Sequence, residues 1–308
     1  MYDVIVIGGG PAGLNAALLL GRSRRRVLVI DAGQPRNAAA RQMHGFLSRD
    51  GIRPGDLLAE GRREAARYDV EVSDDVAVAA HCVPPSDEHP FPTGFEVLTR
   101  SGRKARGRKL LLATGVCDEL PEIPGIRECY GVSVHHCPYC DGWEHRDQRL
   151  AAYGRSPEAA VGLGLALRTW SDRVIVLTDG ERLDERHRKQ LRHNGVRFAV
   201  QRISRLVADD RRLKAVEFEG AASVEIDALF FNTVQRPACD LPAMLGCAMR
   251  NTESATLTNT SPKQRTNVPG LFLAGDADGD VQFAIVAAAE GATAAVAINR
   301  ELQDEDRR

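Results

Sequence analysis

Residues 4–13 read VIVIGGGPAG, an apolar run followed at once by a glycine-rich turn. A short apolar run bounded by such a turn is typical of a buried strand in a parallel sheet. Gly8, Gly10 and Gly13 form the pattern G-x-G-x-x-G, whose glycines permit a tight turn, close approach of a pyrophosphate and close packing of the next helix. A largely apolar segment from Leu14 to Gly21 continues as that helix. The stretch therefore predicts a dinucleotide-binding unit with phosphates at the helix N-terminus.

An acidic residue supports this interpretation. A second apolar run at residues 27–30 ends at Asp31, about 20 residues after the glycine turn, where the motif places its carboxylate. A carboxylate there accepts hydrogen bonds from ribose hydroxyls. Because strand, turn, helix and acid occur in the expected order, we expect nucleotide binding rather than a glycine turn used only for packing.

The rest of the chain repeats this pattern. Beyond the first unit, the sequence predicts strands at 95–99, 109–113, 150–153, 174–177 and 224–231, and helices at 50–68, 159–169 and 286–301. Linker-like segments with proline lie at residues 121–125 and 235–237. The predicted fold is therefore α/β, with two Rossmann-like (three-layer ββα) nucleotide-binding domains. The second domain, residues 118–236, is inserted into the first, residues 1–117 and 237–308.

Charge and hydropathy exclude several classes of function. Among 308 residues, 41 lysines and arginines balance 42 aspartates and glutamates, which gives no argument for nucleic acid or an anionic membrane as partner. No stretch approaches the roughly 18 apolar residues of a membrane span. The first strand follows Met1-Tyr2-Asp3 directly, which leaves no room for a signal peptide. We therefore expect a cytoplasmic protein.

Two of the seven cysteines have motif spacing, namely Cys137 and Cys140 in the sequence CPYC. A sparse, odd count argues against a secreted disulfide framework. A zinc site is disfavoured, because no second ligand pair has matching spacing and His135 and His136 stand too close together, so no metal is expected. We expect a redox dithiol in which a following helix start stabilises one thiolate and exchange passes through a mixed disulfide.

Three signatures together resemble those of flavoprotein disulfide reductases: residues 8–13, Ala113-Thr114-Gly115 and Gly275-Asp276. The cysteine pair followed by Asp141-Gly142 resembles, more specifically, the low-molecular-weight thioredoxin reductases. The resemblance covers essentially the whole chain. It also fits the length, because the glutathione-reductase branch of the family has a further dimerisation domain.

The resemblance implies FAD in the first domain and an NAD(P)-binding-like second domain that carries the dithiol. It implies that Cys140 faces the flavin, that Cys137 attacks the substrate disulfide and that Asp141 moves a proton to or from the dithiol. Helix capping is the alternative role for Asp141. A homodimer is implied as well. The residues expected at the cofactor, with Asp276 at the ribityl chain, are Gly8, Gly10, Pro11, Ala12, Gly13, Asp31, Ala113, Thr114, Gly115, Gly275 and Asp276.

The second glycine loop departs from the family's pattern. It reads GRSPEA at residues 154–159, so Ser156 replaces the second glycine and Glu158 adds a negative charge beside the expected phosphates. Asp179 lies where thioredoxin reductases have arginines for the 2′-phosphate of NADPH. Residues 282–285 read QFAI where the family usually has Arg-Gln-Ala. These differences disfavour NADPH and leave NADH, another donor such as ferredoxin, or no nicotinamide cofactor.

The predicted function is an FAD-dependent thiol-disulfide oxidoreductase resembling thioredoxin reductase, which passes electrons between flavin and a substrate through Cys137 and Cys140. The alternative is an oxygen-using dithiol oxidase, or a reductase with a donor other than NADPH. A non-enzymatic redox sensor is disfavoured by the intact pair and Asp141. The expected partner is a thioredoxin-like protein or a small-molecule dithiol or disulfide, and the sequence does not distinguish the two.

Overall fold

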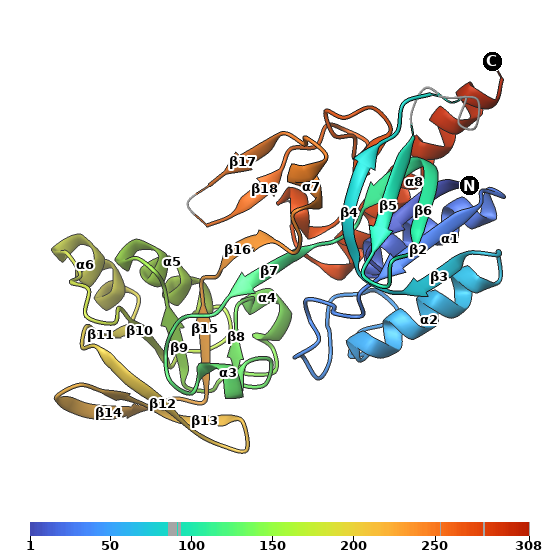
Figure 1. The fold of residues 1–308 in the computed structure, drawn as a ribbon. Coiled ribbons are helices and arrows are strands. Elements are labelled where there is room, and N and C mark those ends of the chain that lie inside the picture. The colour runs from blue at the N-terminus through green and yellow to red at the C-terminus, as the bar shows by residue number, and fades with distance from the viewer. Residues whose placement is uncertain (86–90, 92–93, 253, 280, 308) are drawn as a thin grey trace. The chain divides into compact units, whose positions relative to one another are not determined.

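Two β-sheets with parallel strands organise the chain, one in each of two compact units (Figure 1). The computed structural model describes residues 1–85, 91, 94–252, 254–279 and 281–307. Unit 1 comprises residues 1–38, 45–118 and 235–308, and unit 2 comprises residues 39–44 and 119–234. The predicted α/β class, with one unit inserted into the other, is confirmed, and the short segment 39–44 belongs to the inserted unit as well.

The sheet of unit 1 has the strand order β3-β2-β1-β6-β5-β4, with β19 also paired to β6. The first half of β6 pairs with β5 in antiparallel register, and its second half lies parallel to β1 and β19. The strands of this unit are β1 (Tyr2–Ile7), β2 (Val27–Asp31), β3 (Glu71–Asp74), β4 (Ala77–Cys82), β5 (Phe95–Thr99), β6 (Lys104–Leu112), β17 (Met249–Asn251), β18 (Thr256–Thr258) and β19 (Leu271–Leu273). Two further strands, β7 (Val116–Glu119) and β16 (Val234–Pro237), pair with each other.

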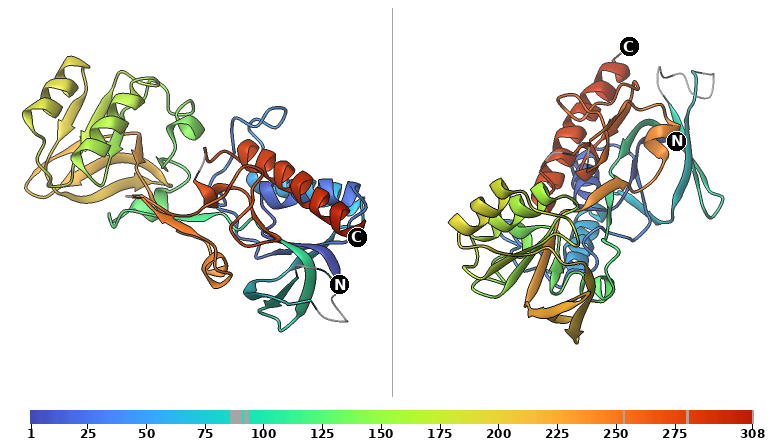
Figure 2. Two further views of the ribbon diagram at one scale, coloured as in Figure 1. Left: turned by 90° about the horizontal axis from the view of Figure 1, so that it is seen from above. Right: turned by 90° about the vertical axis from the view of Figure 1, so that its left-hand side faces the viewer.

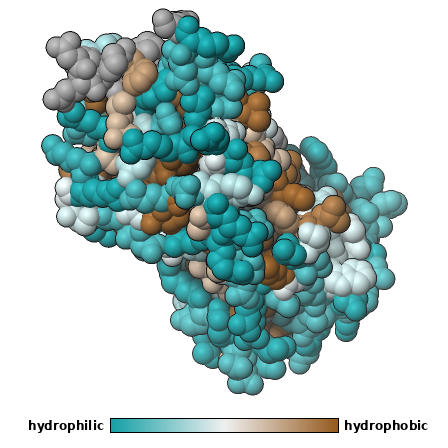
Figure 3. Space-filling model, turned by 90° about the vertical axis from the view of Figure 1, so that its right-hand side faces the viewer, coloured by the Kyte–Doolittle hydropathy of each residue, from teal (hydrophilic) through white to brown (hydrophobic). Residues whose placement is uncertain are grey.

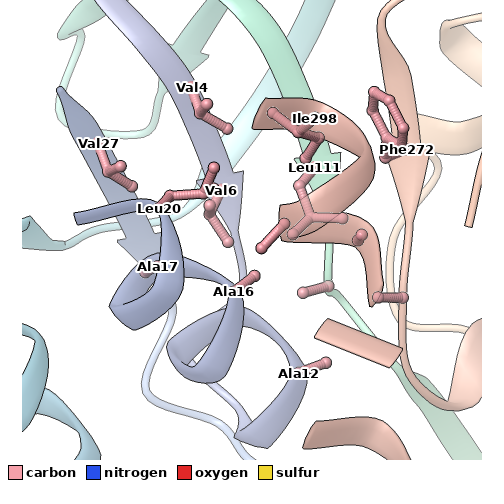
Figure 4. Close-up of a cluster of buried hydrophobic side chains, with 14 of the residues drawn as sticks. Val4, Val6, Ala12, Ala16, Ala17, Leu20, Val27, Leu111, Phe272 and Ile298 are labelled. Atoms are coloured by element: carbon pink, nitrogen blue, oxygen red, sulfur yellow. The ribbon is translucent and has the colours of Figure 1, made fainter. Parts of the chain in front are cut away.

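The two faces of the sheet of unit 1 pack against different layers, because successive side chains of a strand point to opposite faces. Val4 and Val6 pack with residues of α1 and α8 in one cluster (Figure 4), whereas Ile5 and Ile7 belong to a second cluster that includes residues of β5. Figure 2 shows α8 as the longest helix of this unit. The helices are α1 (Pro11–Arg22), α2 (Pro54–Ala66), α7 (Leu241–Met244), the 3-10 helix η1 (Asp276–Asp278) and α8 (Ala284–Asp306).

Unit 2 repeats this design around a parallel sheet of order β11-β10-β9-β15-β8. Leu150 and Ala152 face the cluster that contains α5, while Ala151 faces the antiparallel sheet β12-β13-β14. Its strands are β8 (Val134–His135), β9 (Leu150–Tyr153), β10 (Val174–Leu177), β11 (Arg197–Ala199), β12 (Ile203–Asp209), β13 (Arg212–Phe218), β14 (Ala221–Glu225) and β15 (Ala228–Phe231). Its helices are α3 (Ile126–Cys129), α4 (Pro138–Asp141), α5 (Pro157–Leu167) and α6 (Glu185–His193).

One predicted strand is wrong in its extent. Residues 224–231 form no single strand, because β14 ends at Glu225 and β15 begins at Ala228, in a different sheet. Between them the Asp227 carboxylate accepts hydrogen bonds from the backbone and the guanidinium of Arg149, at 2.6–2.9 Å. This anchoring holds the chain where it passes from one layer to the next, a non-local contact that hydropathy does not report.

The face of the molecule in Figure 3 is mostly hydrophilic, with hydrophobic side chains in separate patches. This distribution agrees with the burial of most large apolar side chains in the cores of the two units. Within the described part of the chain, none of the helices combines the length and the apolar character needed to cross a membrane.

The contact between α1 and α8 gives a test of the packing. A Cβ atom at Gly291 of α8 would lie 2.1 Å from the carbonyl oxygen of Ala12 in α1, whereas one at Gly55 of α2 would meet nothing within 4 Å. Gly291→Ala should therefore lower the free energy of unfolding by about 1–3 kcal/mol through overpacking. The matched change Gly55→Ala should leave it within about 1 kcal/mol. Urea unfolding of both variants measures the difference, and equal stabilities would contradict the packing.

Candidate functional site

At Gly8 and Gly13, between β1 and the first turn of α1, backbone atoms leave no space for a side chain. Gly8 has a φ of +107°, and a Cβ atom there would lie 2.2 Å from the carbonyl oxygen of Ala113. A Cβ atom at Gly13 would lie 1.9 Å from the carbonyl oxygen of Gly8. By contrast, a Cβ atom at Gly10 would meet no atom of the described residues outside its chain neighbours within 4 Å. Gly8 and Gly13 thus hold the helix against the sheet, and Gly10 borders open space.

The N-terminus of α1 suits a phosphate group. The helix begins at Pro11 and its N-cap is Gly10. No side chain of a described residue caps it, and its first turn contains no acidic residue. Its backbone N–H groups and the positive end of its dipole therefore remain available to an anion. The hydroxyl of Thr114, beside Gly115, is buried; it lies near the Cys239 thiol, where it opposes the burial that raises the pKa of Cys239, and it makes no hydrogen bond of good geometry with the described residues. A polar ligand in this region would satisfy it.

Asp31 lies against the glycine turn at the end of β2. Its Oδ2 atom would be 2.4 Å from a Cβ atom at Gly9, so only glycine fits there. Its Oδ1 atom accepts a hydrogen bond from the Gly33 amide at 3.2 Å, and Arg62 donates to Oδ2 at 2.5 Å. The structure therefore brings Asp31 to the turn, as predicted. It adds Gly9 and Arg62, of which only the glycine carried a sequence signal.

Arg36 joins carboxylates that are far apart in the sequence. It forms a bidentate pair with Asp118 at 2.6 and 2.7 Å, and it donates to Asp276 Oδ2 at 2.7 Å and to Gln282 Oε1 at 2.8 Å. Burial opposes the charge of Arg36, but the hydrogen bonds with Asp118 and the attraction of Asp276 outweigh burial and raise its pKa. Asp276 is thus held in place from within unit 1 by an arginine that no motif indicated.

The loop before Asp276 has its own anchor. The backbone N–H of Gly275 donates to Glu290 Oε2 at 2.6 Å, and Glu290 is buried in α8. Ala113 is buried at the end of β6, whose neighbour β19 leads into Gly275. The residues predicted at the cofactor therefore gather at the carboxyl ends of β1, β2, β6 and β19, the edge at which α/β sheets bind ligands.

The cysteine pair lies in unit 2. Cys137 and Cys140 form a disulfide with a Cα–Cα distance of 5.3 Å, and both residues are half-buried. Cys137 is the N-cap of α4, and its sulfur accepts a hydrogen bond from the Cys140 amide at 3.2 Å. Donation from a backbone N–H at a helix start favours a thiolate, so this geometry suits Cys137 as a nucleophile. Among the described residues, no group of three or more histidines, cysteines or acids is placed to hold a metal ion.

Asp141 ends α4 and does not cap its start. Its Oδ1 atom lies 3.2 Å from Nδ1 of His135, which is buried in β8. The other nitrogen of His135, Nε2, lies 3.0 Å from Nε2 of His145, and Nδ1 of His145 lies 3.0 Å from Oε1 of Gln148. The neighbouring His136 contacts the Tyr130 hydroxyl instead, at 3.0 Å. His145 and Gln148 were not predicted, because no spacing rule connects them with the cysteines.

The second glycine loop retains its tight turn but uses its polar side chains internally. A Cβ atom at Gly154 would lie 2.2 Å from the Ala160 nitrogen. The Ser156 hydroxyl caps α5 by accepting from the Ala159 amide at 3.2 Å. Asp179, at a φ of +48°, accepts from the Ile203 amide at 2.7 Å. Two of the departures from the family's pattern, Ser156 and Asp179, therefore have structural roles.

Comparisons with known proteins agree with these features. Residues 2–291 match the family described as pyridine nucleotide-disulphide oxidoreductase. The chain is 34% identical to a probable thioredoxin reductase of Arthroderma benhamiae, an alignment that covers 99% of this chain and 81% of the relative. Among solved structures, it resembles a putative thioredoxin reductase TrxB of Bacillus anthracis, with a TM-score of 0.91, 31% identity and coverage of 99% and 100%.

A second solved structure, of the protein HlmI, is similar to the chain with a TM-score of 0.91 and 38% identity, covering 99% of this chain and 93% of HlmI. The family implies FAD as cofactor and a flavin-dependent disulfide oxidoreductase as activity. The glycine turn, the acid at the end of β2 and the disulfide followed by an acid occur here in the family's order. The chain therefore belongs to the pyridine nucleotide-disulphide oxidoreductase family and is a thioredoxin reductase-like member of it.

Proposed function

We propose that this chain is an FAD-dependent thiol-disulfide oxidoreductase that passes electrons between flavin and a substrate through Cys137 and Cys140. The observation that carries the proposal is a half-buried disulfide at the start of α4 with Asp141 directly behind it. We assign FAD binding to residues 1–117 and 237–308, and the dithiol to an NAD(P)-binding-like domain at residues 118–236.

The residues of unit 1 fit FAD. The uncapped start of α1 and the open space beside Gly10 suit a pyrophosphate, and Asp31 suits a ribose. In this proposal the Asp276 carboxylate binds the ribityl chain, and the buried hydroxyl of Thr114 is free to hydrogen-bond another polar group of the cofactor. Bound there, FAD would supply or accept the two electrons of the disulfide exchange. In the same proposal Arg36 orients the Asp276 carboxylate and balances its charge.

The dithiol exchanges with a substrate in two displacement steps. The Cys137 thiolate attacks one sulfur of a substrate disulfide, so a mixed disulfide forms and one substrate thiolate leaves. Cys140 then attacks Cys137, which restores the Cys137–Cys140 disulfide and releases the second thiolate. Two electrons pass to the substrate, and each departing thiolate takes up a proton. Asp141 is the carboxyl group nearest in sequence to the pair, and in this proposal it exchanges those protons.

A second candidate function is supported by the altered nucleotide loop. Ser156 already satisfies a backbone N–H at the start of α5, and the Asp179 carboxylate would repel a 2′-phosphate. Both observations favour a donor other than NADPH, or the reverse reaction, in which substrate thiols reduce the disulfide and oxygen is the final acceptor. The partner is a thioredoxin-like protein or a small-molecule dithiol or disulfide. The exposed rings of Tyr139 and Trp143, close to the pair in sequence, offer contact area for it.

Flavin absorbance under anaerobic conditions decides the direction. NADPH, NADH and a reduced dithiol such as thioredoxin are added in turn to the FAD-loaded protein. We expect NADPH to reduce the flavin slowly or not at all, because of Ser156 and Asp179, and we expect a dithiol to reduce it. Rapid bleaching by NADPH would contradict the second candidate and identify a reductase of the usual kind.

The role of the disulfide is tested by Cys140→Ser. The change removes the sulfur that closes the disulfide, so turnover with any dithiol or disulfide substrate should be abolished while bound FAD is retained. Cys82→Ser is the matched control, because Cys82 is an exposed free cysteine in β4 of unit 1. Its variant should turn over at the normal rate. Turnover that is retained in Cys140→Ser would contradict the dithiol mechanism.

The proposed pyrophosphate site at the start of α1 is tested by Gly10→Ala. A Cβ atom there meets no atom of the described residues outside its chain neighbours, so the thermal unfolding of the apoprotein should not change. The methyl group would occupy the space proposed for the pyrophosphate. Affinity for FAD should therefore fall by about tenfold or more, since each 1.4 kcal/mol of lost interaction is a factor of ten. Titration of apoprotein with FAD measures the dissociation constant, and an unchanged value would place the cofactor elsewhere.

A further inference from the structure

A row of hydrogen-bonding side chains leads from Asp141 into unit 2. Asp141 Oδ1 and His135 Nδ1 are 3.2 Å apart, the two Nε2 atoms of His135 and His145 are 3.0 Å apart, and His145 Nδ1 is 3.0 Å from Gln148 Oε1. All four residues line one pocket of about 540 Å³. The cysteines are not among its lining residues. The row thus runs along the wall of a space that can hold water, from the acid behind the disulfide to Gln148.

The amide of Gln148 fixes the direction in which protons point. Its oxygen can only accept, so His145 Nδ1 carries the proton and His145 Nε2 accepts. His135 must then donate from Nε2, which leaves its Nδ1 without a proton and facing the Asp141 carboxyl group. Two acceptors 3.2 Å apart repel each other unless one proton lies between them. In this arrangement His135 and Asp141 therefore share one proton beside the disulfide.

The surroundings keep this proton in the row. His135 is buried and packs against the ring of Phe230, with ring centroids 5.5 Å apart. Burial lowers the pKa of His145, the hydrogen bond with Gln148 opposes this shift, and the nearby His135 acts in the same direction as burial. The other charged or titratable groups that face the pocket from segment 39–44, the loop after α4, β13 and the start of β15 are Arg41, His44, Glu144, Arg212, Lys214 and Asp227.

We propose that His135 and His145 form a proton relay that runs from Asp141 along the wall of this pocket to its end at Gln148, whose amide orients the resting row. The inference rests on the proposed thiol-disulfide exchange, which needs a proton acceptor and donor at the dithiol. His135 and His145 touch neither sulfur, so they act through Asp141 as positioning residues. Nothing in the CPYC motif requires either histidine.

Each proton moves along one hydrogen bond, so that one proton enters the row at Asp141 for each proton that leaves it at His145. When Asp141 takes a proton from a cysteine thiol on its other carboxyl oxygen, the shared proton passes to His135 Nδ1, and the proton on His135 Nε2 passes to His145 Nε2. The proton on His145 Nδ1 then leaves to water in the pocket. Afterwards His145 Nδ1 is an acceptor, so the Gln148 amide turns to present its NH₂ group. The reverse transfers bring a proton from the pocket to Asp141 for a departing substrate thiolate.

The kinetic test uses FAD-loaded protein and a readout that does not involve the flavin. Dithiothreitol reduces the Cys137–Cys140 disulfide, and alkylation followed by mass spectrometry counts the thiols formed. His145→Ala should slow this reduction by about tenfold at pH 7, within the range for lost acid–base catalysis. Added imidazole should restore the rate, because it fits the space left by the side chain. A normal rate in His145→Ala, or a slow rate that imidazole does not restore, would overturn the relay.

The matched control is His187→Ala. His187 also contacts an aspartate, with Nδ1 at 2.9 Å from Asp184, but it lies in α6. Its variant should be reduced at the normal rate and should not respond to imidazole. An imidazole effect of the same size in His187→Ala would show that imidazole acts on dithiothreitol rather than on the relay, and the proposal would fail.

Nuclear magnetic resonance of protein with ¹⁵N-labelled histidine tests the relay without any variant of His145. In the oxidised protein, while His135 and Asp141 share one proton, neutral His145 should carry its own proton on Nδ1. When added base removes the shared proton, the proton of His145 should move to Nε2. Asp141→Asn should prevent this change, because the NH₂ group of the introduced amide donates permanently to His135. A tautomer that does not respond to pH, or responds equally in Asp141→Asn, would overturn the proposal.

Different experiments test the proposed thiol-disulfide exchange and the proposed proton relay, so one can be contradicted without the other. Turnover retained by Cys140→Ser removes the proposed function, whereas the tautomer change of His145 is read from the resting protein and needs no substrate. Thermal unfolding of His145→Ala shows whether the variant is folded. If it does not fold, the resonance experiment on the unmodified chain decides alone.

Discussion

The close approach of α1 to the sheet of unit 1 is the constraint on which the first site depends. The carbonyl oxygens of Gly8 and Ala113 leave about 2 Å for a Cβ atom at Gly13 and Gly8, so the turn can be neither widened nor given side chains there. This approach directs the start of α1 to the edge where β1, β2, β6 and β19 end. Asp31 and Asp276 reach the same edge because parallel strands finish together. The position of one helix thus determines where a cofactor can bind.

Much of this arrangement could be predicted from the sequence because it is local. The strand, turn and helix at residues 2–22, the acid at Asp31 and the disulfide at Cys137 and Cys140 each depend on spacing within a short stretch. In β9 and β10 nearly every residue is buried, and successive side chains face the two different clusters of unit 2, as a period of two requires. The predicted ends of helices and strands differ by a few residues from the observed ones, because tertiary contacts as well as propensity decide where an element ends.

Other parts could not be predicted because they depend on contacts between distant segments. Arg36 meets Asp118 and Asp276 only after β6 and β19 are paired, and nothing in the sequence around Arg36 marks it. The row from Asp141 to Gln148 is similar. His135 comes from β8 and His145 from the loop after α4, so their contact requires both the strand pairing of β8 with β15 and the turn after the disulfide. A histidine before a cysteine pair is uninformative until its partner is known.

The altered second loop indicates that the starts of α1 and α5 differ in whether their backbone N–H groups already have hydrogen-bond partners. An N-cap serine stabilises a helix by about 1 kcal/mol, so Ser156 gives the start of α5 a partner in the absence of a phosphate. The Asp179 carboxylate holds the Ile203 amide, and a dinucleotide would have to compete for both groups. Among the described residues, the start of α1 in unit 1 has no such side-chain cap. Unit 1 therefore leaves free the backbone groups that the proposed cofactor site requires, whereas unit 2 uses Ser156 and Asp179 in internal hydrogen bonds.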